Sequence, residues 1–140
     1  MKVREAMAKT VSTASPDDEI VQVARLMKKE DSGFIPITEG SQLVGVITDR
    51  DIVVRCLAAG HGDVLHEKAG HVMSTARVHS VTPNDDLEKA AKMMQREAVR
   101  RLPVVQEGRL VGVLSLGNLV QAMHGEGAAK EATMGVTKGA

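Results

Sequence analysis

Aromatic side chains are almost absent from this chain of 140 residues: Phe34 is the only one, and there is no Trp or Tyr. A surface that binds single-stranded nucleic acid by base stacking needs such rings, so that class of site is excluded. Eighteen basic residues balance eighteen acidic ones. Because binding to phosphate backbones is driven by clustered positive charge, this balance argues against nucleic-acid binding. Any purine bound here must rest mainly on aliphatic side chains.

Cysteine is equally scarce, since Cys56 stands alone. An intrachain disulfide and a Cys-x-x-Cys metal site are therefore excluded. Cys56 lies in the apolar stretch 52–57, which predicts a buried and unreactive thiol. No apolar run approaches the length of a membrane span, and residues 1–5 lead into no apolar signal region. We expect a cytoplasmic protein without membrane contact.

An internal repeat organises the sequence. Residues 16–53 align with residues 83–120 at a constant offset of 67 positions and without a gap. The matched features are a proline two positions before an Asp, a second proline, and a Leu-Val-Gly-Val tetrapeptide. These are Pro16 and Pro83, Pro36 and Pro103, and 43–46 and 110–113. The chain is a tandem duplication, with repeat 1 at residues 1–64, repeat 2 at 65–124, and a loose tail at 125–140.

Local patterns predict the order β-α-β-β-α in each repeat. Ser15-Pro16 and Thr82-Pro83 resemble the start of a helix, with a capping hydroxyl followed by proline, and apolar residues follow at helical spacing. Two apolar runs around a Gly-containing turn predict a hairpin, at 34–47 and again at 102–114. A second helix is expected over 49–59 and 117–124, stopped by Gly60 and Gly125. Short β segments are expected near 10–13 and 78–81, and a linker at 60–69.

The predicted fold class is therefore α/β. A single repeat of about 60 residues buries little apolar surface, so we expect the two repeats to pack sheet against sheet with pseudo-two-fold symmetry.

These residues resemble a known family. Proline-bearing hairpins followed by Gly45-Val46-Ile47-Thr48-Asp49-Arg50-Asp51 are similar to the CBS domain, and two copies are similar to the CBS pair, or Bateman module. The sequences at 48–53 and 99–104 are similar to free-standing bacterial CBS-pair proteins, including the hypoxic response proteins. The resemblance implies clefts for adenosine-containing ligands such as AMP, ADP, ATP or S-adenosylmethionine, and it implies homodimers of paired modules.

The resemblance implies a ligand site at Thr48 and Asp51 of repeat 1. A carboxylate at Asp51 would accept hydrogen bonds from both ribose hydroxyls, and Thr48 would offer its hydroxyl to a phosphate. Arg50 or Arg101 would neutralise phosphate charge. Main-chain groups and apolar side chains would line an adenine slot, formed by Val11, Phe34, Ile35 and Pro36. Thr48-x-x-Asp51 is also a capping box, which stabilises many helices without any ligand.

Repeat 2 departs from this pattern. Ser115 keeps the hydroxyl, but Asn118 replaces the aspartate. An amide hydrogen-bonds a diol more weakly than a carboxylate does, so a weaker or empty second site is expected. Arg100 and Arg101 are candidates for phosphate ligands or for solvated charges.

Other chemistry has little support. His61, His66 and His71 recur every five residues, which does not align metal ligands on a helix, and His79 is expected in an edge strand. No nucleophile–base pair and no Walker loop is present, so we predict a regulatory protein and not an enzyme. It would need no cofactor and would sense an adenine nucleotide, passing the signal to a partner protein or through its dimer. The alternative is a dimeric interaction module that binds no ligand.

Overall fold

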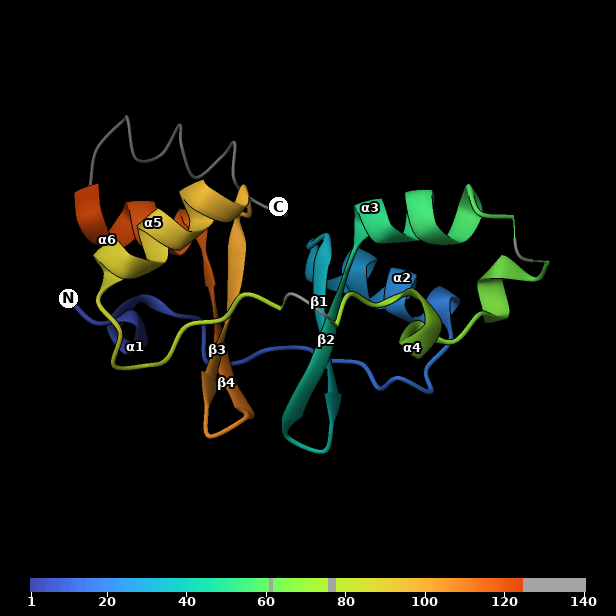
Figure 1. The fold of residues 1–140 in the computed structure, drawn as a ribbon, viewed down its shortest axis with the longest axis horizontal. Helices are drawn as coiled ribbons and strands as arrows, with labels where there is room; N and C mark the ends of the chain where they lie inside the picture. The colour runs from blue at the N-terminus through green and yellow to red at the C-terminus, as the bar shows by residue number, and fades with distance from the viewer. Residues whose placement is uncertain (61, 76–77, 125–140) are drawn as a thin grey trace. The chain divides into compact units, whose positions relative to one another are not determined.

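A computed structural model describes residues 1–60, 62–75 and 78–124, and these residues form two compact units (Figure 1). One unit spans Ser12 to Val78, and we call it the central unit. The other joins residues 1–11 to the chain from His79 onward, and we call it the terminal unit. The units therefore do not coincide with the sequence repeats, for which 1–64 and 65–124 remain the predicted boundaries. The tail predicted at 125–140 lies outside the described residues.

The central unit is built on an antiparallel hairpin. Strand β1 (Phe34–Glu39) pairs with β2 (Gln42–Thr48), and Gly40 supplies the left-handed turn with a φ of 61°. Helix α2 (Ile20–Glu30) packs its apolar face on this hairpin, because Ile20, Val23 and Met27 recur at helical spacing and are all buried. After β2 come α3 (Asp49–Asp51), the π-helical segment η1 (Ile52–Leu57), the 3₁₀ turn η2 (Val64–His66) and α4 (Ala69–Val72).

The terminal unit repeats this plan. Helix α5 (Leu87–Glu97) packs on the hairpin of β3 (Arg101–Gln106) and β4 (Arg109–Ser115), and α6 (Leu116–His124) follows β4 directly. Glu107 and Gly108 form the hairpin turn with positive φ at both positions. Each hairpin has one irregularity in register, between Ile37 and Thr38 in β1 and between Val104 and Val105 in β3. The two repeats therefore have this register irregularity at equivalent positions.

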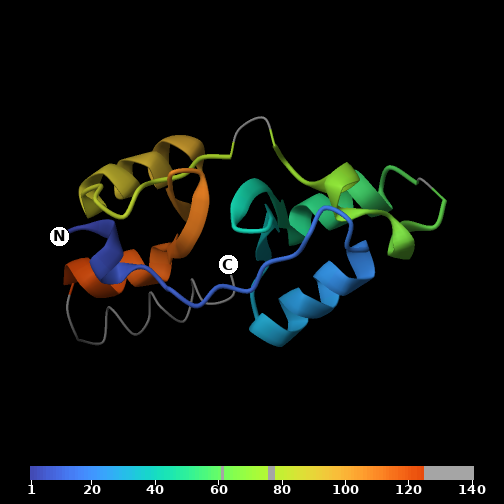
Figure 2. The ribbon, with the colours of Figure 1, turned by 90° about the horizontal axis from the view of Figure 1, so that it is seen from below.

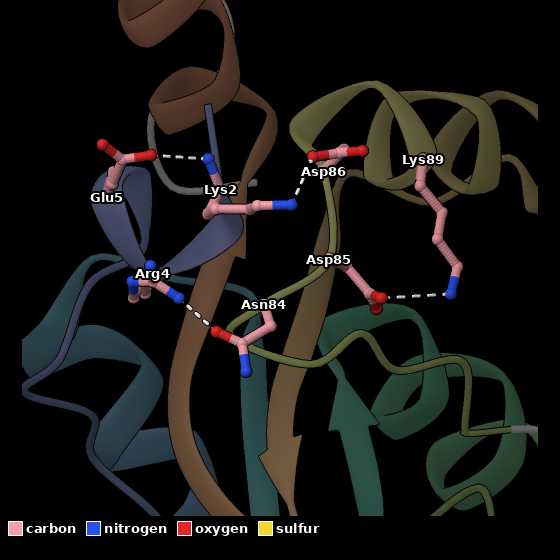
Figure 3. Close-up of polar contacts among 7 residues, drawn as sticks. All are labelled: Lys2, Arg4, Glu5, Asn84, Asp85, Asp86 and Lys89. Carbon is pink, nitrogen blue, oxygen red and sulfur yellow. Dashed lines mark hydrogen bonds and ion pairs between the residues drawn. The ribbon is translucent and has the colours of Figure 1, made fainter.

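Helix α1 (Val3–Ala6), at the very start of the chain, packs in the terminal unit, beside α6 in Figures 1 and 2. The side chain of Val3 is fully buried there among the residues of repeat 2. The Val3 amide donates to the Asp85 carbonyl oxygen at 2.9 Å, and the Leu87 amide donates to the Met1 carbonyl oxygen at 3.0 Å. Side chains extend this contact in Figure 3, where Lys2 reaches Asp86 at 2.9 Å.

Helix α4 makes the matching contacts in the central unit. Ala69, like Val3, is fully buried, and its amide donates to the Asp18 carbonyl oxygen at 2.7 Å. The Ile20 amide donates to the Glu67 carbonyl oxygen at 2.8 Å. Helix α1 thus precedes α2 in the sequence but packs in the terminal unit, which contains α5. Helix α4 precedes α5 in the sequence but packs in the central unit, which contains α2. The linker expected at 60–69 is correspondingly ordered at its C-terminal end, where it belongs to the core.

The predicted helix starts at Ser15-Pro16 and Thr82-Pro83 are wrong by about four residues. The Ser15 amide donates to the Asp18 carboxylate at 2.8 Å and the Thr82 amide to Asp85 at 2.8 Å, so both stretches close into turns. The helices begin only at Ile20 and Leu87. In both stretches the Asp amide also donates back to the carbonyl oxygen of the hydroxyl residue, at 3.0 Å from Asp18 to Ser15 and at 3.2 Å from Asp85 to Thr82, so the backbone forms a β-turn and not a first helical turn.

The other predicted elements agree with the structure more closely. Both hairpins and both second helices are present, although residues 52–57 adopt the wider π-helix and Gly125 lies beyond the described residues. The short β segments expected near 10–13 and 78–81 reduce to single bridges, which pair Ala14 with Ile37 and Val81 with Val104. Within the described part of the chain, no helix has both the length and the apolar character that a membrane crossing requires.

Candidate functional site

Thr48 and Asp51 hold each other at the junction of β2 and α3. The Thr48 amide donates to Oδ2 of Asp51 at 2.9 Å, and the Asp51 amide donates to Oγ1 of Thr48 at 3.2 Å. This is the reciprocal capping box that the sequence predicts. Capping uses only one carboxylate oxygen of Asp51. The other, Oδ1, lies 4.0 Å from Nη1 of Arg55 and keeps its capacity to accept hydrogen bonds.

Phe34 lies directly beside this pair. In the hairpin register Phe34 is opposite Thr48, so the two side chains leave the same face of the strands. The Asp49 amide donates to the Gly33 carbonyl oxygen at 3.0 Å, and a Cβ atom on Gly33 would lie 2.6 Å from Oδ2 of Asp49. The structure therefore brings Phe34, Thr48 and Asp51 together, with Gly33 leaving room for the carboxylate of Asp49.

The remaining residues predicted for repeat 1 lie elsewhere. Ile35 and Pro36 are fully buried, and Ile35 belongs to the core of the central unit. Val11 belongs to the terminal unit, whereas the others belong to the central unit. Arg50 is exposed one position before Asp51. The adenine slot lined by Val11, Phe34, Ile35 and Pro36 stays a prediction.

Repeat 2 carries an equivalent capping pair. The Ser115 amide donates to Oδ1 of Asn118 at 3.0 Å, and the Asn118 amide donates to Oγ of Ser115 at 3.0 Å. Arg101 is opposite Ser115 in the hairpin register, at the position that Phe34 holds in repeat 1. Burial lowers the pKa of Arg101, and the neighbouring Arg100 charge lowers it further. The structure thus brings Arg101, Ser115 and Asn118 together.

Sequence reasoning missed one contact on each repeat. Oγ of Ser12 donates to Glu30 at 2.8 Å, and Nε2 of His79 lies 3.2 Å from Glu97, the residue equivalent to Glu30. His79 is not in a strand. Ser12 and His79 are 67 positions apart, and so are Glu30 and Glu97. A search for polar residues at equivalent positions of both repeats would therefore have found these two contacts.

Cys56 is buried, as predicted, with Sγ 3.6 Å from the Val64 carbonyl oxygen. Burial, and secondarily the charge of Glu67, raises the pKa of its thiol. Of the histidines considered as metal ligands, His66 contacts Glu19 and His71 contacts Glu67, while His61 lies outside the described residues. Among the residues that the structure describes, no three His, Cys, Asp or Glu side chains are placed to hold a metal ion.

Comparisons with known proteins agree with this geometry. The family described as "CBS domain" matches the chain twice, at residues 3–57 and 69–125. The CBS domain-containing protein YhcV of Bacillus subtilis is 40% identical over 132 residues, which cover 94% of this chain and 92% of that protein. Hypoxic response protein 1 of Mycobacterium tuberculosis is 31% identical over 84% of this chain and 82% of that protein.

Solved structures give the same result. Hypoxic Response Protein I, crystallised with two coordinated zinc ions, has a TM-score of 0.80 at 30% identity, over 88% of this chain and 99% of that one. CBSX2, solved in complex with AMP, has a TM-score of 0.75 at 25% identity, over 86% of this chain and 94% of that one. The chain belongs to the CBS domain family and carries two CBS repeats. This confirms both the predicted family and the α/β fold class.

Proposed function

We propose that this protein is a regulatory CBS pair that binds an adenosine-containing ligand, such as AMP, ADP, ATP or S-adenosylmethionine, at Thr48 and Asp51. The observation that carries the proposal is that the two carboxylate oxygens of Asp51 have different environments. One carboxylate oxygen caps the helix, and the other remains as an acceptor for ribose hydroxyls. Its side chain is only 16% exposed, which limits competition by water. The similarity to CBSX2, whose structure contains AMP, supports the ligand class.

The ligand would act as a signal and not as a substrate. Both repeats belong to a family of binding modules, and the proposed site consists of a cap, an aromatic side chain and an acceptor. No cofactor is needed for such a role. A ligand that binds one conformation of the pair more tightly than another shifts the population between them, and a partner protein or the dimer itself can read that shift.

Titration calorimetry on nucleotide-stripped protein tests the ligand, with AMP, ATP and S-adenosylmethionine as probes. Asp51→Asn is the sharpest variant, because an amide oxygen can still cap Thr48, as Asn118 caps Ser115. We expect saturable heat in the natural protein and at least a tenfold weaker affinity in Asp51→Asn, with a melting temperature close to the natural one. Equal affinities in both proteins, or no heat with any probe, would refute the proposed site.

A second candidate function, a dimeric interaction module without ligand, is favoured by the surface of η1. Val53, Val54 and Leu57 are about half exposed, at 56%, 47% and 53%. Positions 53 and 57 lie on one face of a helical segment, so these side chains form an apolar patch that a second copy of the chain could cover. The patch also supports a homodimer for the ligand-binding form, so the two functions share this surface.

Sedimentation velocity on Leu57→Glu tests the dimer. We expect the variant to sediment as a monomer at concentrations at which the natural protein is dimeric. Leu65→Glu is the matched control, because Leu65 is 55% exposed but lies outside η1. An unchanged sedimentation coefficient in Leu57→Glu would exclude η1 as the interface.

A further inference from the structure

A methionine thioether packs against the backbone of the second hairpin strand in each compact unit. In the central unit, Sδ of Met73 lies so close to Gly45 that a Cβ atom on the glycine would be 2.7 Å from the sulfur. In the terminal unit, a Cβ atom on Gly112 would lie 2.8 Å from Sδ of Met7. The two glycines are 67 positions apart and therefore equivalent in the duplication. Each sulfur thus occupies space that only a glycine leaves free.

Each of these methionines immediately precedes a residue that is bonded to the same strand through its backbone. The Ser74 amide donates to the Val46 carbonyl oxygen at 2.9 Å, and the Val46 amide donates to the Ser74 carbonyl oxygen at 3.1 Å. The equivalent pair of hydrogen bonds joins Ala8 and Val113, at 2.9 and 3.0 Å. These bridges attach the chain that follows α4 and α1 to β2 and β4. A methionine that leaves its glycine will therefore disturb the adjacent bridge.

Met7 and Met73 combine access to solvent with a place in the packing. Met27 and Met94 are buried, at 9% and 4% exposed, so a reagent in solution reaches their sulfurs poorly. Met123 is 52% exposed, so a polar group there would stay in water. Met7 and Met73 are partly exposed, and each packs against the apolar core of its unit. They are therefore both reachable and structurally important.

We propose that Met7 and Met73 are oxidation sites, at which a peroxide converts the thioether to methionine sulfoxide and thereby detaches α1 and α4 from their strands. The sulfur lone pair attacks one oxygen of hydrogen peroxide, the O–O bond breaks and an S–O bond forms. The proton of the sulfur-bound hydroxyl passes to the departing hydroxide, which leaves as water. The sulfur is oxidised and the peroxide is reduced.

The sulfoxide does not fit the space that the thioether fills. It is polar and carries one more oxygen atom, whereas the sulfur of Met73 already lies against the strand at Gly45. A sulfoxide oxygen kept in this contact would also lose its hydrogen bonds to water. Moving the side chain into solvent removes both costs but weakens the bridge between residues 74 and 46. The same argument applies to Met7 and Gly112, and neither step requires a nucleotide.

Peptide mapping by mass spectrometry after treatment with hydrogen peroxide measures which methionines react. The Cys56→Ala background removes the one thiol of the chain, which could also react. We expect Met7 and Met73 to be oxidised about tenfold faster than the buried Met27. Met123 gives the rate of an exposed side chain. Oxidation of Met7 and Met73 as slow as that of Met27 would overturn the proposal.

Amide hydrogen exchange, measured by NMR in the same background, reports the structural consequence. We expect the amides of Val46 and Ser74 to exchange about tenfold faster in the oxidised protein. Methionine sulfoxide reductases A and B, which together reduce both sulfoxide epimers, should restore the original rates. The double variant Met7→Leu/Met73→Leu keeps apolar side chains of similar volume but forms no sulfoxide, so peroxide should leave its exchange unchanged.

Met93→Leu is the matched control, because Met93 is also partly exposed but packs from α5 into the core of the terminal unit. Peroxide should accelerate exchange in this variant as in the natural protein. Unchanged exchange after full oxidation of Met7 and Met73, or acceleration that persists in the double variant, would overturn the proposal. Met73→Gln adds a polar side chain of similar length and should accelerate exchange at Ser74 without peroxide. Natural exchange in Met73→Gln would contradict the proposed mechanism.

Discussion

His66 of the 3₁₀ turn η2 contacts Glu19, the residue that caps α2, through Nδ1 and the carboxylate. Asp63 lies on the other side of the imidazole, with Oδ2 3.9 Å from Nε2, and Lys68 adds a positive charge near Glu19. The hydrogen bond to Glu19, followed by the charge of Asp63, raises the pKa of His66. The same hydrogen bond lowers the pKa of Glu19. The turn η2 is thus joined to α2 by an ion pair whose strength depends on the protonation of His66 and Glu19.

The stability of the central unit should therefore depend on pH through His66. A histidine whose pKa is raised in the folded state contributes fully below its unfolded pKa of about 6.5 and loses that contribution as the pH rises through the folded value. Glu19, with a lowered pKa, contributes above about 4.5 and loses its contribution as the pH falls. We expect His66→Gln to lower the melting temperature by roughly 2 °C near pH 6 and by less at pH 8.5.

A thermal unfolding series between pH 4.5 and 8.5 measures this difference. In the Glu19→Gln background, His66→Gln should change the pH profile much less, because the main partner has been removed and only the weaker effect of Asp63 remains. A His66→Gln effect that is equally large at pH 6 and pH 8.5, in either background, would show that the imidazole acts by packing and not by charge.

The two capping hydroxyls should contribute similar stability. Oγ1 of Thr48 and Oγ of Ser115 each accept a backbone hydrogen bond, at 3.2 and 3.0 Å. We expect Thr48→Ala and Ser115→Ala each to lower the free energy of unfolding by about 1 kcal/mol in urea denaturation, and Thr48→Ser to lower it much less. A Thr48→Ala protein as stable as the natural one would mean that the hydroxyl serves only a ligand.

The hairpins and the capping boxes were predictable because their signals are local. The turn residues, the apolar runs and the Thr48-x-x-Asp51 spacing lie within a few positions of one another. The positions of α1 and α4 were not predictable, because the amides of Val3 and Ala69 donate to the carbonyl oxygens of Asp85 and Asp18, which are remote in the sequence. The burial of Ile35 depends on helix α2, which covers its face of the hairpin, and periodicity in one strand does not reveal this. The π-helical geometry of 52–57 has no recognised sequence signature.

Gly112 should tolerate no side chain. A Cβ atom there would lie 2.7 Å from the Ala8 carbonyl oxygen, which belongs to the backbone of the N-terminal segment bridged to Val113. We expect Gly112→Ala to lower the free energy of unfolding by about 2 kcal/mol, measured by urea denaturation, because the segment must move away.

Gly33→Ala is the control for this measurement. The three atoms nearest to its added Cβ atom all belong to the side chain of Asp49, which is exposed and can rotate. The control should therefore lose much less stability than Gly112→Ala. Equal losses in the two variants would show that the close approach of residue 8 is not the cause, because the loss of glycine flexibility alone stabilises the folded state.

Cys56 should react slowly with thiol reagents in the native protein. Its side chain is 3% exposed, and burial raises the pKa of the thiol above its ordinary value of 9.0. We expect the rate of reaction with a disulfide reagent at pH 8 to rise at least a hundredfold in denaturant, because both access and thiolate fraction increase. A native rate close to the denatured rate would show that the region around η1 opens readily.

The place of α1 in the terminal unit has a consequence for biosynthesis. The ribosome releases residues 1–11 before the rest of the described chain, but the surface that buries Val3 is made of residues from Val81 to Ala122. The N-terminal segment must wait, exposed, until almost all of the described chain has emerged. The central unit, whose residues run continuously from 12 to 78, can close earlier. The order of synthesis thus imposes an order of assembly, in which the unit that holds residues 1–11 is completed after the central unit.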